Sequence, residues 1–483
     1  MTRTVRNALI FWGVITGLII FEFLWIYSRH GLPGFQAFIQ EAPYTHIPIT
    51  LTSVALTWLL AGFLLWLILA GKITRATGLS WAGFFIIAFL YLNILRERVR
   101  YGDIDYYTQA AFALIKNKPL PDTYFYPPLW ATLLSFLTPL GENGILLIAW
   151  IANVLSFLLF YFLLQRTLEL YQFRPYAAAM TATLFVLVNM PVIRTFMYVQ
   201  VNFHVMNFIL LSILFYKRST PQHLHRTQVQ VSGSVDKDRV FLSALMLALA
   251  VHFKASPAFL ILAFLLEFNW KWLIWFVVNM ALIASFTVAF YGIEPYFDFI
   301  NNFLFINAPH GLSLHDSSFD SAIGVTLSYF RVDLSTIRIL VFLVKGFTAI
   351  ATISLSIRSQ GFFPSEGGKE RLFNSIVPLF VGMTLLSPLV WEHHAIFLTL
   401  PFLLMLKKLE SPAEWTAYGA TYLLVFLTPT FDYFPWSYGR LVGILILLAL
   451  LWISRNRSNN TFFPLFNAWS ESLFGWKPQT KIT

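Results

Sequence analysis

The chain has 483 residues, of which 58% are hydrophobic and only 12% are charged. A soluble domain is about half apolar and about a quarter charged, so this composition excludes a soluble protein and indicates a polytopic membrane protein. The absence of cysteine excludes a disulfide framework, thiol catalysis and cysteine-ligated metal centres. The net charge of +10 is best explained by basic cytoplasmic loops, and we expect no nucleic-acid partner.

Apolar segments along the chain predict its helices. The first, 8–27, follows two arginines but ends in bulky side chains without a cleavage site, so we expect a retained helix and not a signal peptide. The others lie at 47–70, 79–95, 144–164, 176–198, 201–216, 240–252, 257–268, 272–291, 336–357, 373–389, 394–406, 414–430 and 438–454. Several of these are short for a full span and should be covered by protein or line a cavity. The sequence therefore predicts an all-α polytopic membrane protein with about 12–14 transmembrane helices.

The distribution of Lys and Arg predicts which side each loop faces. If the N-terminus is inside, the inner loops hold most basic residues, from Lys72 and Arg75 to Arg455 and Arg457. The opposite side then receives a series of carboxylates: Asp103, Asp105, Asp122, Asp298, Asp316, Asp320, Asp333, Glu392 and Asp432. We therefore expect an inner N-terminus and a long outer loop over 96–143.

Two carboxylates stand early in that outer loop. Asp103 and Asp105 follow an apolar segment and precede residues 106–118, whose composition suits an amphipathic helix at the membrane interface. A carboxylate there is a candidate general base that removes a proton from an acceptor hydroxyl. The alternatives are a helix N-cap beside a surface carboxylate, and an Asp-x-Asp metal site that two residues alone do not complete. Spacing alone leaves catalysis and capping open.

Two groups of basic residues are candidates for holding an anionic phosphate. Arg96, Arg98 and Arg100 stand just before the carboxylates, and on a helix end Arg96 and Arg100 share a face. Lys254 lies between two short apolar helices, where a charge is costly and indicates a binding role. The alternatives are arginines that extend towards lipid head groups and a lysine that reaches water at the outer surface.

Other polar residues interrupt the apolar pattern. Trp391, Glu392, His393 and His394 follow one another at the outer end of a helix. Adjacent helical histidines diverge by roughly 100° and chelate poorly, but one of them could face a cleft and contact a phosphate or the aspartate. His315 and Asp316 in the loop 292–335 are similar candidates, and Gln200 and Asn202 offer hydrogen bonds to sugar hydroxyls or to a neighbouring helix.

Taken in order, these motifs resemble bacterial glycosyltransferase family 87, which is grouped with mannosyltransferases that use polyprenol-phosphate mannose. The resemblance covers roughly residues 90–406. The motifs are Gly102-Asp103-Ile104-Asp105-Tyr106-Tyr107, Tyr124-Phe125-Tyr126-Pro127-Pro128-Leu129, Gln200-Val201-Asn202, Lys254-Ala255-Ser256-Pro257 and Ser387-Pro388-Leu389-Val390-Trp391-Glu392-His393-His394. Where this chain has His315-Asp316-Ser317, the family often has Asn-Gln-Ser.

The resemblance implies a GT-C architecture in the bacterial cytoplasmic membrane, with an active site at its outer face. It implies a polyprenyl-phosphate sugar donor, often of mannose, and a lipid-linked or glycan acceptor. It places the catalytic base on Asp103, four residues before Tyr107, with Asp105 as the alternate. It also places one of the two histidines at the donor phosphate or acceptor, and Tyr107, Tyr126, Trp391 and Glu392 become candidate contacts of the acceptor or sugar.

We therefore expect an inverting glycosyltransferase that needs no cofactor or metal and that contacts its donor, its acceptor and membrane lipids. Residues 1–78 are expected to be an N-terminal addition of transmembrane helices, 79–406 the catalytic membrane core, and 407–483 further transmembrane helices with a cytoplasmic tail. The main alternative is a polytopic transporter or lipid flippase, which predicts charges near the midplane and internal repeats. Here the polar candidates gather at one face and no repeat is found.

Overall fold

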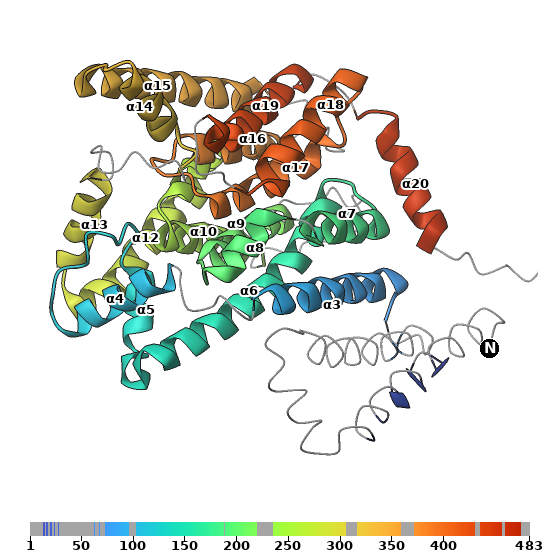
Figure 1. The fold of residues 1–483 in the computed structure, drawn as a ribbon, viewed down its shortest axis with the longest axis horizontal. Helices are drawn as coiled ribbons and strands as arrows, with labels where there is room; N and C mark the ends of the chain where they lie inside the picture. The colour runs from blue at the N-terminus through green and yellow to red at the C-terminus, as the bar shows by residue number, and fades with distance from the viewer. Residues whose placement is uncertain are drawn as a thin grey trace, which may run out of the picture. The chain divides into compact units, whose positions relative to one another are not determined.

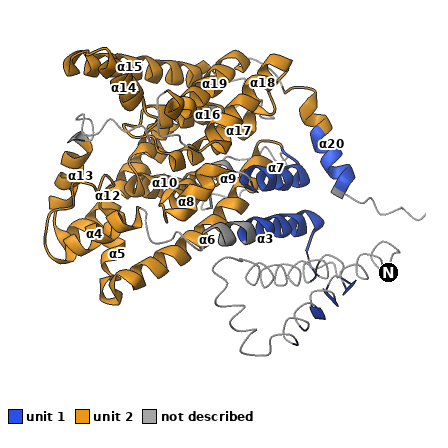
Figure 2. Cartoon of the chain, viewed as in Figure 1, with its two compact units in different colours: residues 1–99, 173–187, 466–483 blue, residues 100–172, 188–465 orange. Residues whose placement is uncertain are grey.

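The computed structural model describes residues 73–95, 103–187, 189–219, 235–305, 316–358, 371–429, 435–455 and 459–474, with scattered positions before residue 73. These residues form helices joined by short turns and contain no strand, which confirms the all-α prediction. The chain divides into two compact units (Figure 2). Unit 1 comprises residues 1–99, 173–187 and 466–483, and unit 2 comprises residues 100–172 and 188–465.

In unit 1, α3 (Arg75–Leu95) packs against α7 (Pro175–Leu187). The C-terminal part of α20 (Phe462–Phe474) belongs to the same unit. There Asn467 accepts a hydrogen bond from the backbone N–H of Arg174 at 3.1 Å, and Glu471 pairs with the Arg174 guanidinium. The helix α20 forms in a segment that the sequence had suggested only as a tail.

Unit 2 contains the remaining helices (Figure 1). Its first half comprises α4 (Ile104–Ile115), α5 (Leu129–Ser135), η1 (Thr138–Leu140), α6 (Gly141–Leu170), α8 (Met190–Met197), α9 (Asn202–Ser219), α10 (Val235–Phe253), η2 (Ser256–Leu260), α11 (Ile261–Leu266) and α12 (Trp270–Tyr291). Its second half comprises α13 (Glu294–Phe305), α14 (Phe319–Tyr329), α15 (Leu334–Arg358), α16 (Arg371–Leu385), η4 (Glu392–Leu398), α17 (Thr399–Met405), α18 (Pro412–Thr421), η5 (Tyr422–Leu427), η6 (Trp436–Tyr438) and α19 (Gly439–Ser454).

Four described helical segments are long and apolar enough to cross a membrane. They are Thr138–Leu170, Trp270–Tyr291, Leu334–Arg358 and Trp436–Ser454, and α7 with α8 makes a fifth if the two form one broken span. The expected helix 176–198 is interrupted because Asn189 adopts an extended backbone and caps α8, accepting a hydrogen bond from the N–H of Val192 at 3.0 Å. The chain is thus an integral membrane protein.

The core of unit 2 brings distant segments together. α10 packs against α9 and α12, α6 packs against α9, and α8 packs against η4. α16 contacts α15, η2 and η4, while α19 packs against α18 and η5. η2 and η4 are short helices that contact these longer ones. The polar residues of η4, Glu392, His393 and His394, are buried, as we expected for a short apolar segment covered by protein.

Candidate active site

Helix α4 begins at the residue after Asp103, and its first turn carries the second carboxylate, Asp105. Asp103 occupies the N-cap position, yet its side chain makes no capping hydrogen bond. The Asp103 side chain is 26% exposed, and Asp105, in the first turn, is exposed. The two carboxylates therefore differ in exposure, and the Asp103 carboxylate is not used in capping its own helix.

Basic and aromatic side chains from other helices surround the Asp103 carboxylate. His393 of η4 places its Nε2 4.0 Å from the Asp103 Oδ2, and the Tyr126 hydroxyl donates a hydrogen bond to the same carboxylate. The charge of Lys254, between α10 and η2, acts on it as well. Burial raises the pKa of Asp103 to about 6, while Lys254 and Tyr126 oppose this shift. Asp103 is thus an ionisable carboxylate whose pKa is moved towards neutrality.

Lys254 lies outside the candidate spans, in the turn that links two short helices. Its Nζ donates a hydrogen bond to the Asn202 Oδ1 at 3.0 Å and lies 5.7 Å and 5.5 Å from the ring centres of Tyr126 and Phe397. Burial lowers the pKa of Lys254 to about 7, and the charge of Asp103 opposes this shift. Lys254 is half-buried, with its Nζ directed to Asn202 and to two aromatic rings.

The side-chain amides of Asn202 and Gln200 differ in how many of their polar atoms have hydrogen-bond partners. Asn202 accepts from Lys254 and donates through Nδ2 to the backbone carbonyl of His393 at 3.3 Å, so both ends of its amide are occupied. Gln200 accepts from the Tyr107 hydroxyl at 2.9 Å, and its Oε1 lies 3.5 Å from the hydroxyl oxygen of Tyr126. Its Nε2, fully buried, has no hydrogen-bond partner among the described residues. Gln200 therefore keeps one donor without a partner among the described residues, whereas Asn202 joins the lysine to η4.

The two histidines also differ. The His394 Nδ1 lies 3.0 Å from the Leu389 carbonyl oxygen and 3.2 Å from the Trp391 nitrogen, so this ring is held within its own turn. His393 is buried, and its Nε2 has no hydrogen-bond partner among the described residues. Burial, followed by the charge of Lys254, holds the pKa of both imidazoles well below its usual range. Each ring is therefore neutral and can act as a hydrogen-bonding group but not as a cation.

The loop that carries Tyr126 is fixed by α13. Asp298 accepts a hydrogen bond from the N–H of Leu120 at 2.9 Å, and Asn302 donates to the carbonyls of Pro121 at 2.9 Å and Tyr124 at 3.2 Å. The ring of Tyr126 in turn meets that of Tyr107 edge to face, with centres 5.1 Å apart. The segment 292–335, expected as a loop, thus supplies a helix that supports the site.

Asp316 supports the turn in front of η4. Its Oδ1 accepts from the N–H of Val390 at 2.7 Å and of Ser318 at 3.0 Å, and its Oδ2 accepts from the Ser318 hydroxyl at 2.7 Å. These three donors occupy a carboxylate that is itself buried. Asp316 therefore positions the turn that leads to His393, and its contact with acceptor or sugar stays a prediction. His315, Arg96, Arg98 and Arg100 lie outside the described residues.

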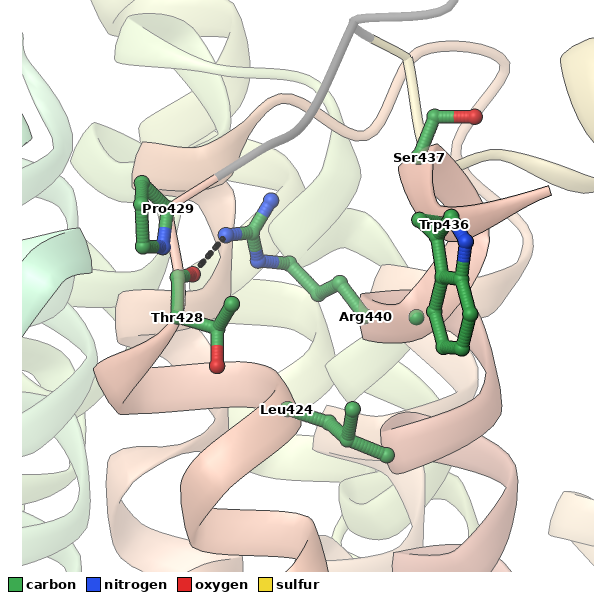
Figure 3. Close-up of a pocket in the computed structure, with 7 residues that line it drawn as sticks. Leu424, Thr428, Pro429, Trp436, Ser437 and Arg440 are labelled. Atoms are coloured by element: carbon green, nitrogen blue, oxygen red, sulfur yellow. Dashed lines mark hydrogen bonds between the residues drawn. The ribbon is translucent and has the colours of Figure 1, made fainter. Parts of the chain in front are cut away.

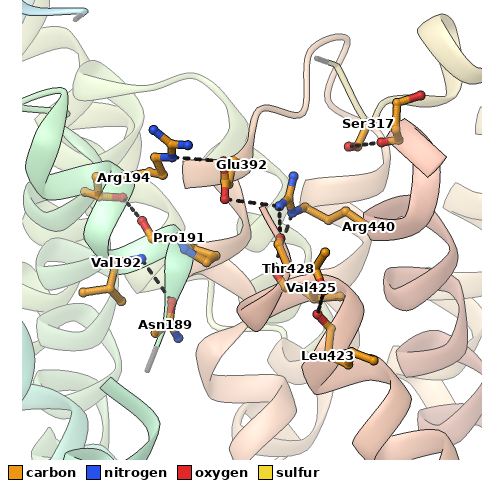
Figure 4. Close-up of polar contacts among 12 residues, drawn as sticks. Asn189, Pro191, Val192, Arg194, Ser317, Glu392, Leu423, Val425, Thr428 and Arg440 are labelled. Atoms are coloured by element: carbon orange, nitrogen blue, oxygen red, sulfur yellow. Dashed lines mark hydrogen bonds and ion pairs between the residues drawn. The ribbon is translucent and has the colours of Figure 1, made fainter. Parts of the chain in front are cut away.

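Glu392 joins two arginines that the sequence analysis did not single out (Figure 4). Its Oε2 lies 3.2 Å from the Nε of Arg194 on α8, and its Oε1 lies 3.5 Å from a terminal nitrogen of Arg440 on α19. Trp391 beside it is 39% exposed. Both arginines stand within apolar segments, and a charge in such a segment was the signal available for finding them. Glu392 is therefore an ion-pairing residue between two helices.

A comparison with protein-family models identifies the family of this chain. The model of glycosyltransferase family 87 matches residues 124–388, a stretch that contains Tyr126, Arg194, Gln200, Asn202 and Lys254. No curated protein matches the chain. The match covers more than half of the 483 residues, and it favours a transferase over the transporter alternative. The chain belongs to glycosyltransferase family 87 and is a membrane glycosyltransferase.

Proposed function

We propose that this protein transfers a sugar, with mannose the leading candidate, from a polyprenyl-phosphate donor to a lipid-linked or glycan acceptor. The observation that supports this most strongly is the placement of Asp103. Its side chain is partly exposed, makes no cap for α4, and meets a half-buried lysine and a buried neutral histidine from distant segments. Such a carboxylate suits a general base that faces an acceptor hydroxyl.

The reaction follows from these groups. Asp103 takes the proton of the acceptor hydroxyl while the acceptor oxygen bonds to the anomeric carbon of the donor sugar. The bond from that carbon to the phosphate oxygen breaks on the opposite face, and its electron pair leaves with the polyprenyl phosphate. The anomeric configuration is inverted, and Asp103 later releases its proton to water. The leaving phosphate is anionic, so it needs positive partners more than a proton.

Lys254 is the described cation nearest to this chemistry. Its position between Asp103, Tyr126 and Asn202 allows it to attract the donor phosphate while keeping Asp103 ionised. The free donor of Gln200 and the unpartnered Nε2 of His393 can bind sugar or acceptor oxygens, because both are buried polar atoms with no other partner among the described residues. Such groups favour a ligand that returns their hydrogen bonds.

The pH dependence of transfer tests this function. Asp103 must be ionised to accept a proton, so kcat/KM should fall as the pH drops through about 6. Lys254 must be charged to attract phosphate, so kcat/KM should also fall as the pH rises through about 7. Bound phosphate favours the charged lysine, so the alkaline limb of kcat should lie at higher pH than that of kcat/KM.

The measurement is transfer from polyprenyl-phosphate mannose by the purified full-length protein, reconstituted in lipid, over a pH range that brackets both values. A profile without an acid limb would contradict the role of Asp103. The absence of any transfer at every pH, in folded protein supplied with a membrane glycolipid extract as acceptor, would contradict the proposed donor.

A further inference from the structure

One side of helix α13 presents exposed apolar side chains. Ile293, which directly precedes the helix, and Phe297 and Ile300 within it are all exposed, and Phe297 is 57% exposed. Residues spaced by four and then three positions lie on one face of a helix. These three side chains therefore form a continuous surface, which we call the apolar stripe of α13.

Another side of α13 is polar and holds the loop that carries Tyr126. Asp298 and the buried Asn302 make three hydrogen bonds of 2.9–3.2 Å to backbone groups of residues 120–124. If α13 rotated to bury its apolar stripe, these hydrogen bonds would break and buried polar groups would lose their partners. The contacts with the loop therefore keep the stripe on the outside of the protein.

Two candidate membrane spans end close to the start of α13. Trp270–Tyr291 ends at Tyr291, and Thr138–Leu170 begins three residues after Ser135. The hydroxyl groups of Ser135 and Tyr291 lie 2.6 Å apart, so these two span ends meet. α13 begins three residues after Tyr291 and thus starts within about 11 Å of this point.

The exposed apolar surface of the spans continues onto α13. Phe286 and Phe290 on α12 are exposed, as is Phe136 beside them, and the rings of Phe136 and Phe290 meet edge to face with centres 5.0 Å apart. Gly292 ends α12 with a φ of +74°, a left-handed conformation that suits glycine, so α13 is a separate helix and not an extension of the span. The apolar stripe is thus next in the chain to a surface that faces lipid.

A third candidate span begins on the same side as the candidate active site. Trp436, which lines the pocket drawn in Figure 3, is the first residue of the span Trp436–Ser454 and is 65% exposed. The carbonyl of Ser437 accepts a hydrogen bond from the Ser317 hydroxyl at 3.4 Å, and the Ser317 N–H donates to the carbonyl of Val390 in front of η4 at 3.0 Å. An exposed tryptophan at the end of a span is typical of the membrane interface.

We propose that α13 lies along the membrane interface with its apolar stripe among the lipid chains, and that this contact with lipid holds the loop that carries Tyr126 in place. The partner is the bilayer itself, because the stripe continues the exposed surface of two span ends. Glu294 and Asn301, the exposed polar residues beside the stripe, then meet head groups and water.

The absence of cysteine from the chain allows a direct test, because a single introduced cysteine can carry a nitroxide label. Ile293→Cys, Phe297→Cys and Ile300→Cys are labelled one at a time in the full-length protein in lipid vesicles. Collisions with oxygen, which enters lipid, are compared with collisions with a water-soluble nickel chelate. We expect oxygen to dominate at all three labels and the three depths to be similar. An upright α13 would instead separate the outermost labels by about 10 Å in depth.

Two labelled controls set the limits of this measurement. Phe286→Cys, on the exposed face of a candidate span, reports lipid, and Lys118→Cys, exposed after α4, reports water. Nickel access at Phe297→Cys and Ile300→Cys equal to that at Lys118→Cys would overturn the inference. Immobile labels that neither reagent reaches would overturn it too, because protein, such as a second copy of the chain, would then cover the stripe.

The link between lipid and loop is tested with a label on the loop itself. Thr123→Cys is exposed, and its label should become more mobile when Phe297→Asp places a charge in the stripe, as it should when Asn302→Ala removes two hydrogen bonds to the loop. Asn301→Asp, which adds the same charge beside the stripe, is the matched control and should leave the spectrum unchanged.

An unchanged loop spectrum in Phe297→Asp would overturn the link between lipid and loop, whether or not Asn302→Ala loosens the loop. An equal change in Asn301→Asp would overturn it as well, because the effect would then not depend on the stripe. None of these measurements requires sugar transfer. Failure of the inference therefore leaves the proposed function standing, and a protein that transfers no sugar leaves the inference standing.

Discussion

Asp103→Asn is expected to lower turnover by about two to four decades, which is the usual contribution of a general base. The substitution keeps the size of the side chain and its ability to accept a hydrogen bond from Tyr126, but it removes the group that takes the proton. Binding of the donor should survive, because its phosphate partners are other residues. The measurement is kcat with a polyprenyl-phosphate sugar, together with the Kd of polyprenyl phosphate.

Asp105→Asn is the matched control for this substitution. Asp105 is exposed in the first turn of α4, whereas Asp103 faces Lys254 and His393, so the control should remain within a few-fold of wild-type turnover. If turnover collapses in Asp105→Asn but stays near normal in Asp103→Asn, the general base is Asp105. Equal losses in both variants, relieved by added divalent cation, would support the metal-binding alternative instead.

Lys254→Met is expected to have the second largest effect. Loss of a hydrogen bond to a charged ligand costs about 1.5–3 kcal/mol, which corresponds to roughly a ten- to hundredfold weaker use of donor. The same substitution removes the charge that lowers the pKa of Asp103, so this pKa should rise above about 6 and the acid limb of kcat/KM should move to higher pH. The measurement is the donor KM and the full pH profile.

Two controls separate charge from packing at this position. Lys254→Arg keeps the positive charge and should return the acid limb towards its wild-type position even if donor affinity stays reduced. Lys271→Met removes an exposed lysine on α12 and should change neither quantity. An unchanged donor KM and an unmoved acid limb in folded Lys254→Met protein would leave Lys254 with a structural role only.

The sequence predicted the parts of the site that depend on local patterns. The composition of residues 106–118 predicted a helix there, and α4 forms over Ile104–Ile115, two residues earlier at its start. The rarity of lysine within apolar segments marked Lys254. Spacing could not decide whether Asp103 caps its helix. That question depends on the side chains of Tyr126, Lys254 and His393, which approach Asp103 from other parts of the chain. His393 is almost three hundred positions away from Asp103.

The sequence could not predict the ion pairs around Glu392. Arg194 and Arg440 stand in segments that are apolar enough to be taken as ordinary membrane helices, and nothing local indicates that both meet the same carboxylate. The helices α13, α14 and α20 were missed for a related reason, because each is shorter than a membrane span and lies in a segment taken as a loop or a tail. Tertiary packing stabilises such helices, and local hydrophobicity does not reveal them.

The donor class is tested most directly by following a labelled sugar. Purified wild-type protein, reconstituted with a membrane glycolipid extract, is given mannose carried either on polyprenyl phosphate or on a nucleotide. We expect label to enter the glycolipid fraction from the lipid donor and not from the nucleotide, with inversion at the anomeric carbon and with a loss of about two decades or more in Asp103→Asn. Transfer from the nucleotide sugar, or undiminished transfer by Asp103→Asn, would contradict the proposal that Asp103 drives sugar transfer from a lipid phosphate.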